Sequence, residues 1–210
     1  MPPVLLRAAV IAAFVYALTA LAILTARTLS FGRRPVFSRS AGSARAGVTY
    51  AFLKGMLPWE KESVAGHVPT FVAGLLYHAG IFLAFLQLLL VVTGLRPGAV
   101  LLKPLRVVIT LGLVAGLGLL LKRAALRKMR MISVPDDVVA NVMVDLFLAA
   151  AVATTMSHAF ASVFLIMAIA LFLYMPMGKI RHCVFFFYTR IVFGMFFGRR
   201  GVLPHPRTDS

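Results

Sequence analysis

The sequence predicts an all-α protein, a bundle of five transmembrane helices with the N-terminus outside and the C-terminus in the cytoplasm. Hydrophobic residues make up 61% of its 210 residues and charged residues only 13%, a composition typical of polytopic membrane proteins. The apolar residues gather in runs of about 20, the length that a helix needs to cross a bilayer. Basic residues gather in alternate connections between these runs.

The predicted spans run from Pro3 to Ala26, Val68 to Thr93, Leu105 to Leu121, Val138 to Met156 and Ala159 to Met175. The first apolar run is too long for the core of a signal peptide, so we interpret it as an uncleaved helix. The last span is expected to continue past the kinking Pro176 to about His182. Residues 1–182 are therefore predicted to form one five-helix membrane domain.

Orientation follows from the basic residues, which crowd the first and third connections (Arg27, Arg33, Arg34, Arg39, Arg45, Lys54 and Lys61; then Lys122, Arg123, Arg127, Lys128 and Arg130). Lys and Arg near span ends stay on the cytoplasmic side, so residues 27–67 are predicted to form a cytoplasmic loop. Topology and contact with anionic membrane lipid then explain the net charge of +16. We expect no nucleic-acid partner, because the basic residues do not form an aromatic-interleaved soluble domain.

Residues 183–210 are predicted to form an interfacial aromatic helix followed by a cytoplasmic tail. The aromatic stretch after His182 is short and interrupted by Arg190, which disfavours a sixth span. The loop 27–67 is long for a simple connection, so we expect it to dock a cytoplasmic partner.

Two histidines on different predicted helices suggest bis-imidazole ligation of a haem. His78 lies in the apolar run Leu76-Tyr-His-Ala-Gly-Ile-Phe, where a ring nitrogen is costly to bury unless it coordinates or hydrogen-bonds something. His182 closes Tyr174-Met-Pro-Met-Gly-Lys-Ile-Arg-His at the membrane edge. His78 is about 10 residues, or ~15 Å, into its span, so both are expected in the inner half of the bilayer.

Both histidines have an alternative to haem ligation. His78 would be a core histidine hydrogen-bonded to a backbone carbonyl, and His182 would be an ordinary residue at the membrane interface. The single cysteine, Cys183, excludes an internal disulfide and the covalent attachment of c-type haem. Any haem is therefore expected to be held noncovalently.

Two further histidines are candidates for supporting roles. His67 precedes His78 by 11 residues and would share its helical face if the helix extended that far. We favour a role for His67 at the cytoplasmic edge, capping a helix or contacting a haem propionate, over axial ligation. His158, in the tight fourth connection, is either a quinone-site residue or a loop histidine satisfied by water.

Three charged residues complete the set of candidates. Asp145 lies well inside the fourth span, where acids usually line a cavity or pair with another group. It is either part of a proton relay, quinone site or propionate-linked network, or it makes a structural hydrogen bond, and Asn141, one turn earlier, is expected to join the same polar seam. Lys179 and Arg181 are either propionate partners or plain topology charges.

The two histidine motifs resemble those of the γ subunit of respiratory nitrate reductase and related cytochrome b subunits of quinone-linked complexes. The family's Pro-Phe-Ser-Lys/Arg-Leu-x-His motif corresponds to Pro176-Met-Gly-Lys-Ile-Arg-His182 here. The resemblance covers most of the membrane region and implies that His78 and His182 ligate the inner haem. The family's outer ligands would fall near Leu88 and Phe164, which cannot ligate iron, so one haem b is expected.

This resemblance implies a monohaem membrane subunit in a bacterial or archaeal cytoplasmic membrane. It would transfer electrons between the quinone pool, as menaquinone, and a cytoplasmic iron–sulfur subunit of the heterodisulfide-reductase-like type. The alternative is a haem-free membrane anchor or assembly subunit that docks a catalytic partner. A transporter is disfavoured, because the sequence has no duplicated half and little polar lining.

Overall fold

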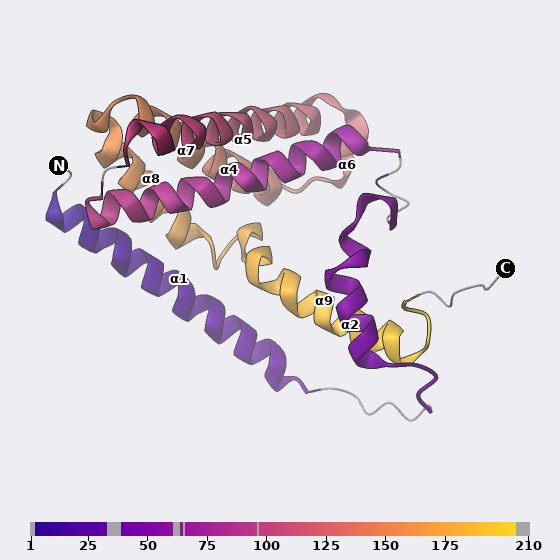
Figure 1. The fold of residues 1–210 in the computed structure, drawn as a ribbon. Coiled ribbons are helices and arrows are strands. Elements are labelled where there is room, and N and C mark those ends of the chain that lie inside the picture. The colour runs from indigo at the N-terminus through magenta and orange to yellow at the C-terminus, as the bar shows by residue number, and fades with distance from the viewer. Residues whose placement is uncertain (1–2, 33–38, 61–63, 65, 96, 205–210) are drawn as a thin grey trace. The chain divides into compact units, whose positions relative to one another are not determined.

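The computed structural model describes residues 3–32, 39–60, 64, 66–95 and 97–204 (Figure 1). These residues form helices and turns without a strand, which confirms the predicted all-α class. The α-helices are α1 (Val4–Ser30), α2 (Ala44–Phe52), α4 (Val68–Thr93), α5 (Ala99–Ala125), α6 (Arg127–Ile132), α7 (Pro135–Met156), α8 (Ala161–Tyr174) and α9 (His182–Arg199). Short 3-10 turns are η1 (Lys54–Met56), η2 (Pro58–Glu60), η3 (His158–Phe160) and η4 (Lys179–Arg181).

Within the described residues, five helices are long and apolar enough to cross a membrane, which confirms a multi-pass membrane protein. They are Val4–Ser30, Val68–Thr93, Ala99–Ala125, Pro135–Met156 and Lys179–Arg199. The first four correspond to the first four predicted spans, and only Pro3 of the first span lies outside its helix. The third begins earlier than predicted, at Ala99 rather than Leu105. Pro104, which was expected to precede the helix, lies in its second turn.

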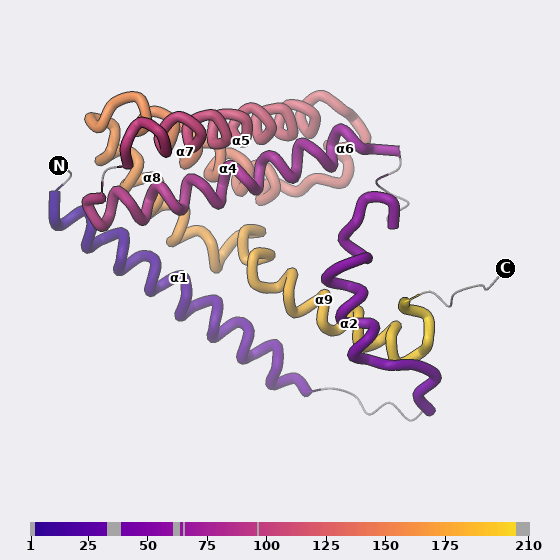
Figure 2. Tube along the Cα trace, viewed as in Figure 1, coloured from indigo at the N-terminus to yellow at the C-terminus, as the bar shows by residue number. Residues whose placement is uncertain are grey.

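The fifth membrane-length helix is not the predicted one. α8 has 14 residues, or about 21 Å, which is short for a hydrocarbon core of about 30 Å. α8 does not run on to His182, because Pro176 has no N–H to continue the helix and the chain turns back on Tyr174. The N–H groups of Met177 and Gly178 both donate to the Tyr174 carbonyl oxygen at 3.0 Å, and Figure 2 traces this break.

The helix Lys179–Arg199, which includes the aromatic stretch after His182, is long and apolar enough to cross a membrane, so this stretch is longer as a helix than predicted. Its predicted place at the membrane interface stays a prediction. α9 runs for 18 residues without a break, because no proline interrupts it and Arg190, the arginine in its interior, is tolerated within an aromatic helix. The Arg190 guanidinium lies 5.4 Å from the centre of the Phe186 ring, where the ring face attracts a cation.

The chain forms two compact units, and the first comprises Met1–Ala20 and Pro69–Ile180. In this unit α7 packs against both α5 and α8, and Figure 1 shows α4, α5 and α7 side by side. Its core is apolar and aromatic: Phe147 lies 5.1 Å from Phe164 and 5.2 Å from Phe85 between ring centres. Gly80 and Gly112 let α4 and α5 touch, since a Cβ on either would lie 2.7–2.8 Å from the other's Cα, as is common where membrane helices meet.

The second unit comprises Leu21–Val68 and Arg181–Ser210. Here the predicted loop 27–67 contains α2, which packs against α9. The contact is close because glycines meet: a Cβ on Gly198 would lie 2.7 Å from Gly47 Cα. The Tyr50 hydroxyl donates to Glu60 at 2.6 Å, and this hydrogen bond raises the pKa of Tyr50.

Candidate functional site

His78 stands on a face of α4 that is exposed on the first unit. Its neighbours on that face are apolar, and Leu75 and Phe82 remain 57% and 68% exposed. The ring nitrogen Nδ1 lies 2.8 Å from the carbonyl oxygen of Gly74, one turn earlier. A carbonyl only accepts, so Nδ1 carries the proton, and in the neutral ring Nε2 is the nitrogen with a lone pair.

This arrangement suits a haem ligand. A histidine that binds a metal usually donates its second ring N–H to a carbonyl or carboxylate, which fixes the tautomer and the ring orientation. The described residues contain no group of three or more His, Cys, Asp or Glu that could hold a metal ion, but a bis-imidazole haem needs only two histidines.

His182 is the first residue of α9 and is exposed on the second unit. The Pro176 turn and η4 precede it, so it begins a new helix rather than ending the last predicted span. His78 belongs to the first unit and His182 to the second. Their pairing about one iron therefore stays a prediction.

The predicted supporting residues lie in different settings. His67 immediately precedes α4, and its backbone N–H donates to Val64 O at 2.8 Å. Because α4 begins at Val68, it does not extend to His67, so the face that His67 was expected to share with His78 does not form. Arg181 is exposed at the start of α9.

Lys179 takes part in an ion cluster at the start of α7. Its Nζ lies 2.6 Å from Asp137 Oδ1, and Arg123 Nη1 lies 3.2 Å from the same oxygen. The other carboxyl oxygen of Asp137 accepts the Val134 backbone N–H at 2.9 Å. A carboxylate in the first turn also suits the helix dipole, so this cluster fixes the start of α7 and ties it to the end of α5.

Asp145 lies in a buried polar cluster together with Asn141, Tyr77 and Gly116. Asp145 and Asn141 are 4% and 7% exposed, and Asn141 Nδ2 donates to Asp145 Oδ2 at 2.8 Å. The same amide lies 3.2 Å from the Tyr77 hydroxyl and 3.3 Å from Gly116 O. The predicted polar seam of Asn141 and Asp145 is thus confirmed.

Tyr77 and Gly116 were missed in the sequence, because only packing shows what they contact. A Cβ on Gly116 would overlap Asp145 Oδ1 and the Tyr77 ring, so the position requires glycine. Among the described residues Asp145 Oδ1 has no hydrogen-bond partner. The cluster therefore holds a carboxyl group deep among apolar helices, where it can keep or pass on a proton.

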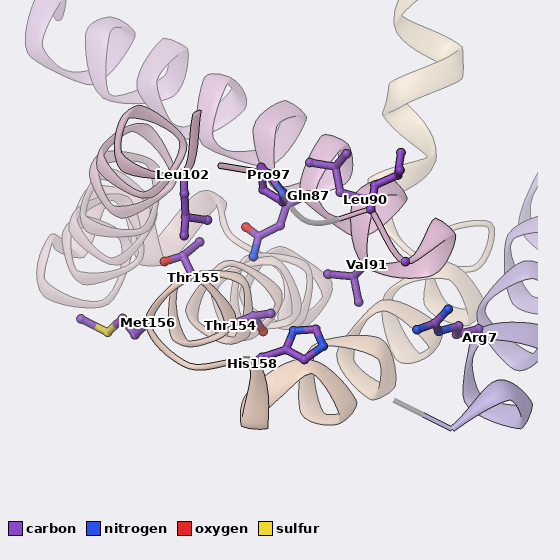
Figure 3. Close-up of a pocket in the computed structure, with 12 residues that line it drawn as sticks. Arg7, Gln87, Leu90, Val91, Pro97, Leu102, Thr154, Thr155, Met156 and His158 are labelled. Atoms are coloured by element: carbon purple, nitrogen blue, oxygen red, sulfur yellow. The ribbon is translucent and has the colours of Figure 1, made fainter. Parts of the chain in front are cut away.

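His158 lines a pocket at one end of the first unit, with a volume of about 260 Å³ (Figure 3). Arg7 of α1, Gln87 of α4 and His158 of η3 all line it, and Figure 3 shows the Gln87 amide on the Thr155 side of the pocket, with Val91 between it and Arg7. The other lining residues are mainly apolar at the ends of α4, α5 and α7: Leu90, Val91, Gly94, Leu95, Pro97, Leu102, Thr154, Thr155 and Met156. Arg7 resembled a topology charge in the sequence, and no local pattern marked it as part of a site.

No protein-family profile matches the chain, and neither a curated protein nor a solved structure is significantly similar to it. The resemblance to the nitrate reductase γ subunit stays a prediction from its two motifs. In the part of the chain that the structure describes, it establishes an all-α fold with five helices of membrane-spanning length.

Proposed function

We propose that this protein is a haem b-containing membrane subunit of a respiratory redox complex. It transfers electrons between the quinone pool and a cytoplasmic iron–sulfur subunit. The observation that carries the proposal is the hydrogen bond from His78 Nδ1 to the Gly74 carbonyl at 2.8 Å, on an apolar face of a membrane-length helix. It gives the imidazole the tautomer and support that iron ligation requires.

His182 is the proposed second ligand, supported by its place in the Pro176 to His182 motif. Bound haem supplies a one-electron carrier. This chain's part is to hold the iron through His78 and His182 and to enclose the group in an apolar setting. Arg181 and His67 are the proposed contacts for propionates, whereas Lys179 already pairs with Asp137.

The proposed orientation places the N-terminus outside and the C-terminus in the cytoplasm of a bacterial or archaeal cell. Support comes from the basic residues at the end of α5 and in α6, namely Lys122, Arg123, Arg127, Lys128 and Arg130, since such residues stay inside. The same rule puts residues 27–67 inside, and α2, which lies within that range, belongs to the proposed docking surface.

We propose that the quinone, as menaquinone, binds near the haem rather than at His158. The pocket at His158 includes Gln87, which is nine residues and about 13 Å further along α4 than His78. One haem held by His78 and His182 would have no second haem to reach that end. Asp145 is the proposed proton relay of the quinone reaction.

A haem-free anchor is the second candidate, because the Gly74 carbonyl would equally satisfy a purely structural histidine. To distinguish the haem-containing subunit from the haem-free anchor, the protein is isolated from membranes with its native partners and its haem spectrum is followed. Reduction of the haem by a menaquinol analogue or by the reduced iron–sulfur partner supports the proposal. A complex whose haem neither donor reduces, or whose soluble subunit lacks iron and sulfide, overturns it.

A further inference from the structure

The pocket at the end of the first unit has polar groups that the proposed electron transfer does not use. It lies where α4 ends at Thr93, α5 begins at Ala99 and α7 ends at Met156. Ends of membrane-spanning helices lie near the lipid headgroups. A ligand in this pocket would therefore meet both polar headgroups and the edge of the hydrocarbon.

Arg7 supplies hydrogen-bond donors to this pocket, and the described residues accept from few of them. Its guanidinium makes one hydrogen bond to the described residues, from Nη1 to the Val92 carbonyl oxygen at a long 3.5 Å. Its Nε is buried and lacks a partner among the same residues. A guanidinium has five N–H donors, so the remaining ones call for an acceptor.

Arg106, at the same end of the unit, shows what a purely structural arginine does here. Its Nε donates to Thr155 Oγ1 at 3.0 Å, and its Nη2 donates to the Thr155 carbonyl oxygen. Both bonds cap the end of α7. To the residues that the structure describes, Arg7 makes no such pair of bonds at the end of α4, so capping uses only one of its five N–H donors.

Gln87 adds an acceptor. The side chain is 4% exposed, and its Nε2 donates to the Ala151 carbonyl oxygen at 3.0 Å. That bond fixes the amide, and Oε1 has no partner within the part of the chain that the structure describes. A buried polar atom without a partner is costly, so a ligand that donates to Oε1 is favoured.

We infer that this pocket binds the headgroup of an anionic phospholipid that carries hydroxyl donors, of the phosphatidylglycerol type. The phosphate lies against Arg7, because a guanidinium binds phosphate oxygens in a matched geometry. A glycerol hydroxyl donates to Gln87 Oε1, and the first methylenes of the acyl chains cover apolar residues such as Leu90, Leu95 and Leu102. An uncharged quinone ring would leave the Arg7 charge without a counterion.

Lipid binding to the full purified chain in detergent tests this inference, read by native mass spectrometry and by thermal unfolding. The probes are dioctanoyl phosphatidylglycerol, phosphatidic acid, phosphatidylcholine and a short-chain menaquinone. We expect the wild-type protein to bind phosphatidylglycerol about tenfold more tightly than phosphatidylcholine, since the choline headgroup lacks net negative charge and donors. Phosphatidic acid, which lacks the glycerol hydroxyls, should bind with an intermediate affinity.

Two variants separate the contacts. Arg7→Gln should weaken phosphatidylglycerol binding by about tenfold or more. Gln87→Leu should remove the preference for phosphatidylglycerol over phosphatidic acid while keeping the preference for an anion. Arg27→Gln removes an exposed cation from the same helix outside the pocket and should change neither.

Equal binding of phosphatidylglycerol and phosphatidylcholine to the wild-type protein would overturn the inference, even if a variant failed to fold. So would a loss in Arg27→Gln as large as that in Arg7→Gln, which would indicate attraction by overall charge. Displacement of phosphatidylglycerol by menaquinone at equal concentrations would assign the pocket to a quinone instead. None of these outcomes depends on haem, so the inference and the proposed function can fail separately.

Discussion

Replacing Gly116 by alanine tests whether α5 is held at the buried carboxyl group as the structure describes. The added Cβ would overlap Asp145 Oδ1 and the Tyr77 ring. Both groups are buried, so neither can move into solvent. Gly118, two residues later on the same helix, is exposed and has nothing within 4 Å of an added Cβ, which makes it a matched control.

The two substitutions should change the free energy of unfolding in opposite directions. Alanine gains up to about 1 kcal/mol over glycine inside a helix, so Gly118→Ala should be neutral or slightly stabilising. At Gly116 the same gain is opposed by overpacking, about 1–3 kcal/mol, and by distortion of the Asn141 bonds, about 1 kcal/mol. The free energies of unfolding of the two variants should therefore differ by about 2–4 kcal/mol.

The assay is reversible unfolding in mixed micelles, monitored by helical circular dichroism. A double-mutant cycle with Asp145→Ala then tests the contact, because removing the carboxyl makes room for the new methyl group. The combined variant should lose less stability than the sum of the single variants. If Gly116→Ala and Gly118→Ala unfold alike, or if the two changes simply add, the described packing of α5 against α7 is wrong.

Three further changes follow from the packing. Phe164→Ala removes a fully buried ring (0% exposed) and should cost about 3–5 kcal/mol, whereas Phe82→Ala, 68% exposed, should cost little; equal losses in the same unfolding assay would contradict the described core. Asp137→Asn should cost about 1 kcal/mol, because the cap and two half-exposed ion pairs weaken together, and the loss should shrink in high salt. Gly198→Leu should push α2 away from α9 and expose residues 39–60 to limited proteolysis, while an unchanged cleavage pattern would argue against that contact.

The sequence predicted the spans best where one apolar run met one helix. α4 has the predicted bounds, α5 and α7 contain the third and fourth predicted runs, and α1 begins one residue after the first, because hydrophobic length is a local property. The end of α8 was placed wrongly since a proline can kink a membrane helix or end it. Here the hydrogen bonds from Met177 and Gly178 to Tyr174 end it, and the sequence does not show which outcome is favoured.

In the candidate sites, contacts within one helix could be predicted from the sequence, whereas contacts between helices could not. Asn141 and Asp145 are four residues apart on one helix, so their hydrogen bond was predictable. The contact of His78 with Gly74 has the same spacing and was open to the same reasoning. Tyr77 and Gly116 join the polar cluster from other helices, and Arg7 reaches the end pocket from a segment about 80 residues from Gln87 in sequence. Only the packed structure brings such residues together.

The haem content of the chain purified with its native partners tests the central claim most directly. The measurement is the dithionite-reduced minus air-oxidised spectrum, quantified as the pyridine haemochrome, for the wild-type protein and for His78→Ala, His182→Ala and His158→Ala. The account predicts one haem b per chain, lost in the first two variants and retained in the third. Two haems would contradict the monohaem claim, and a wild-type protein without haem would contradict the cytochrome proposal itself.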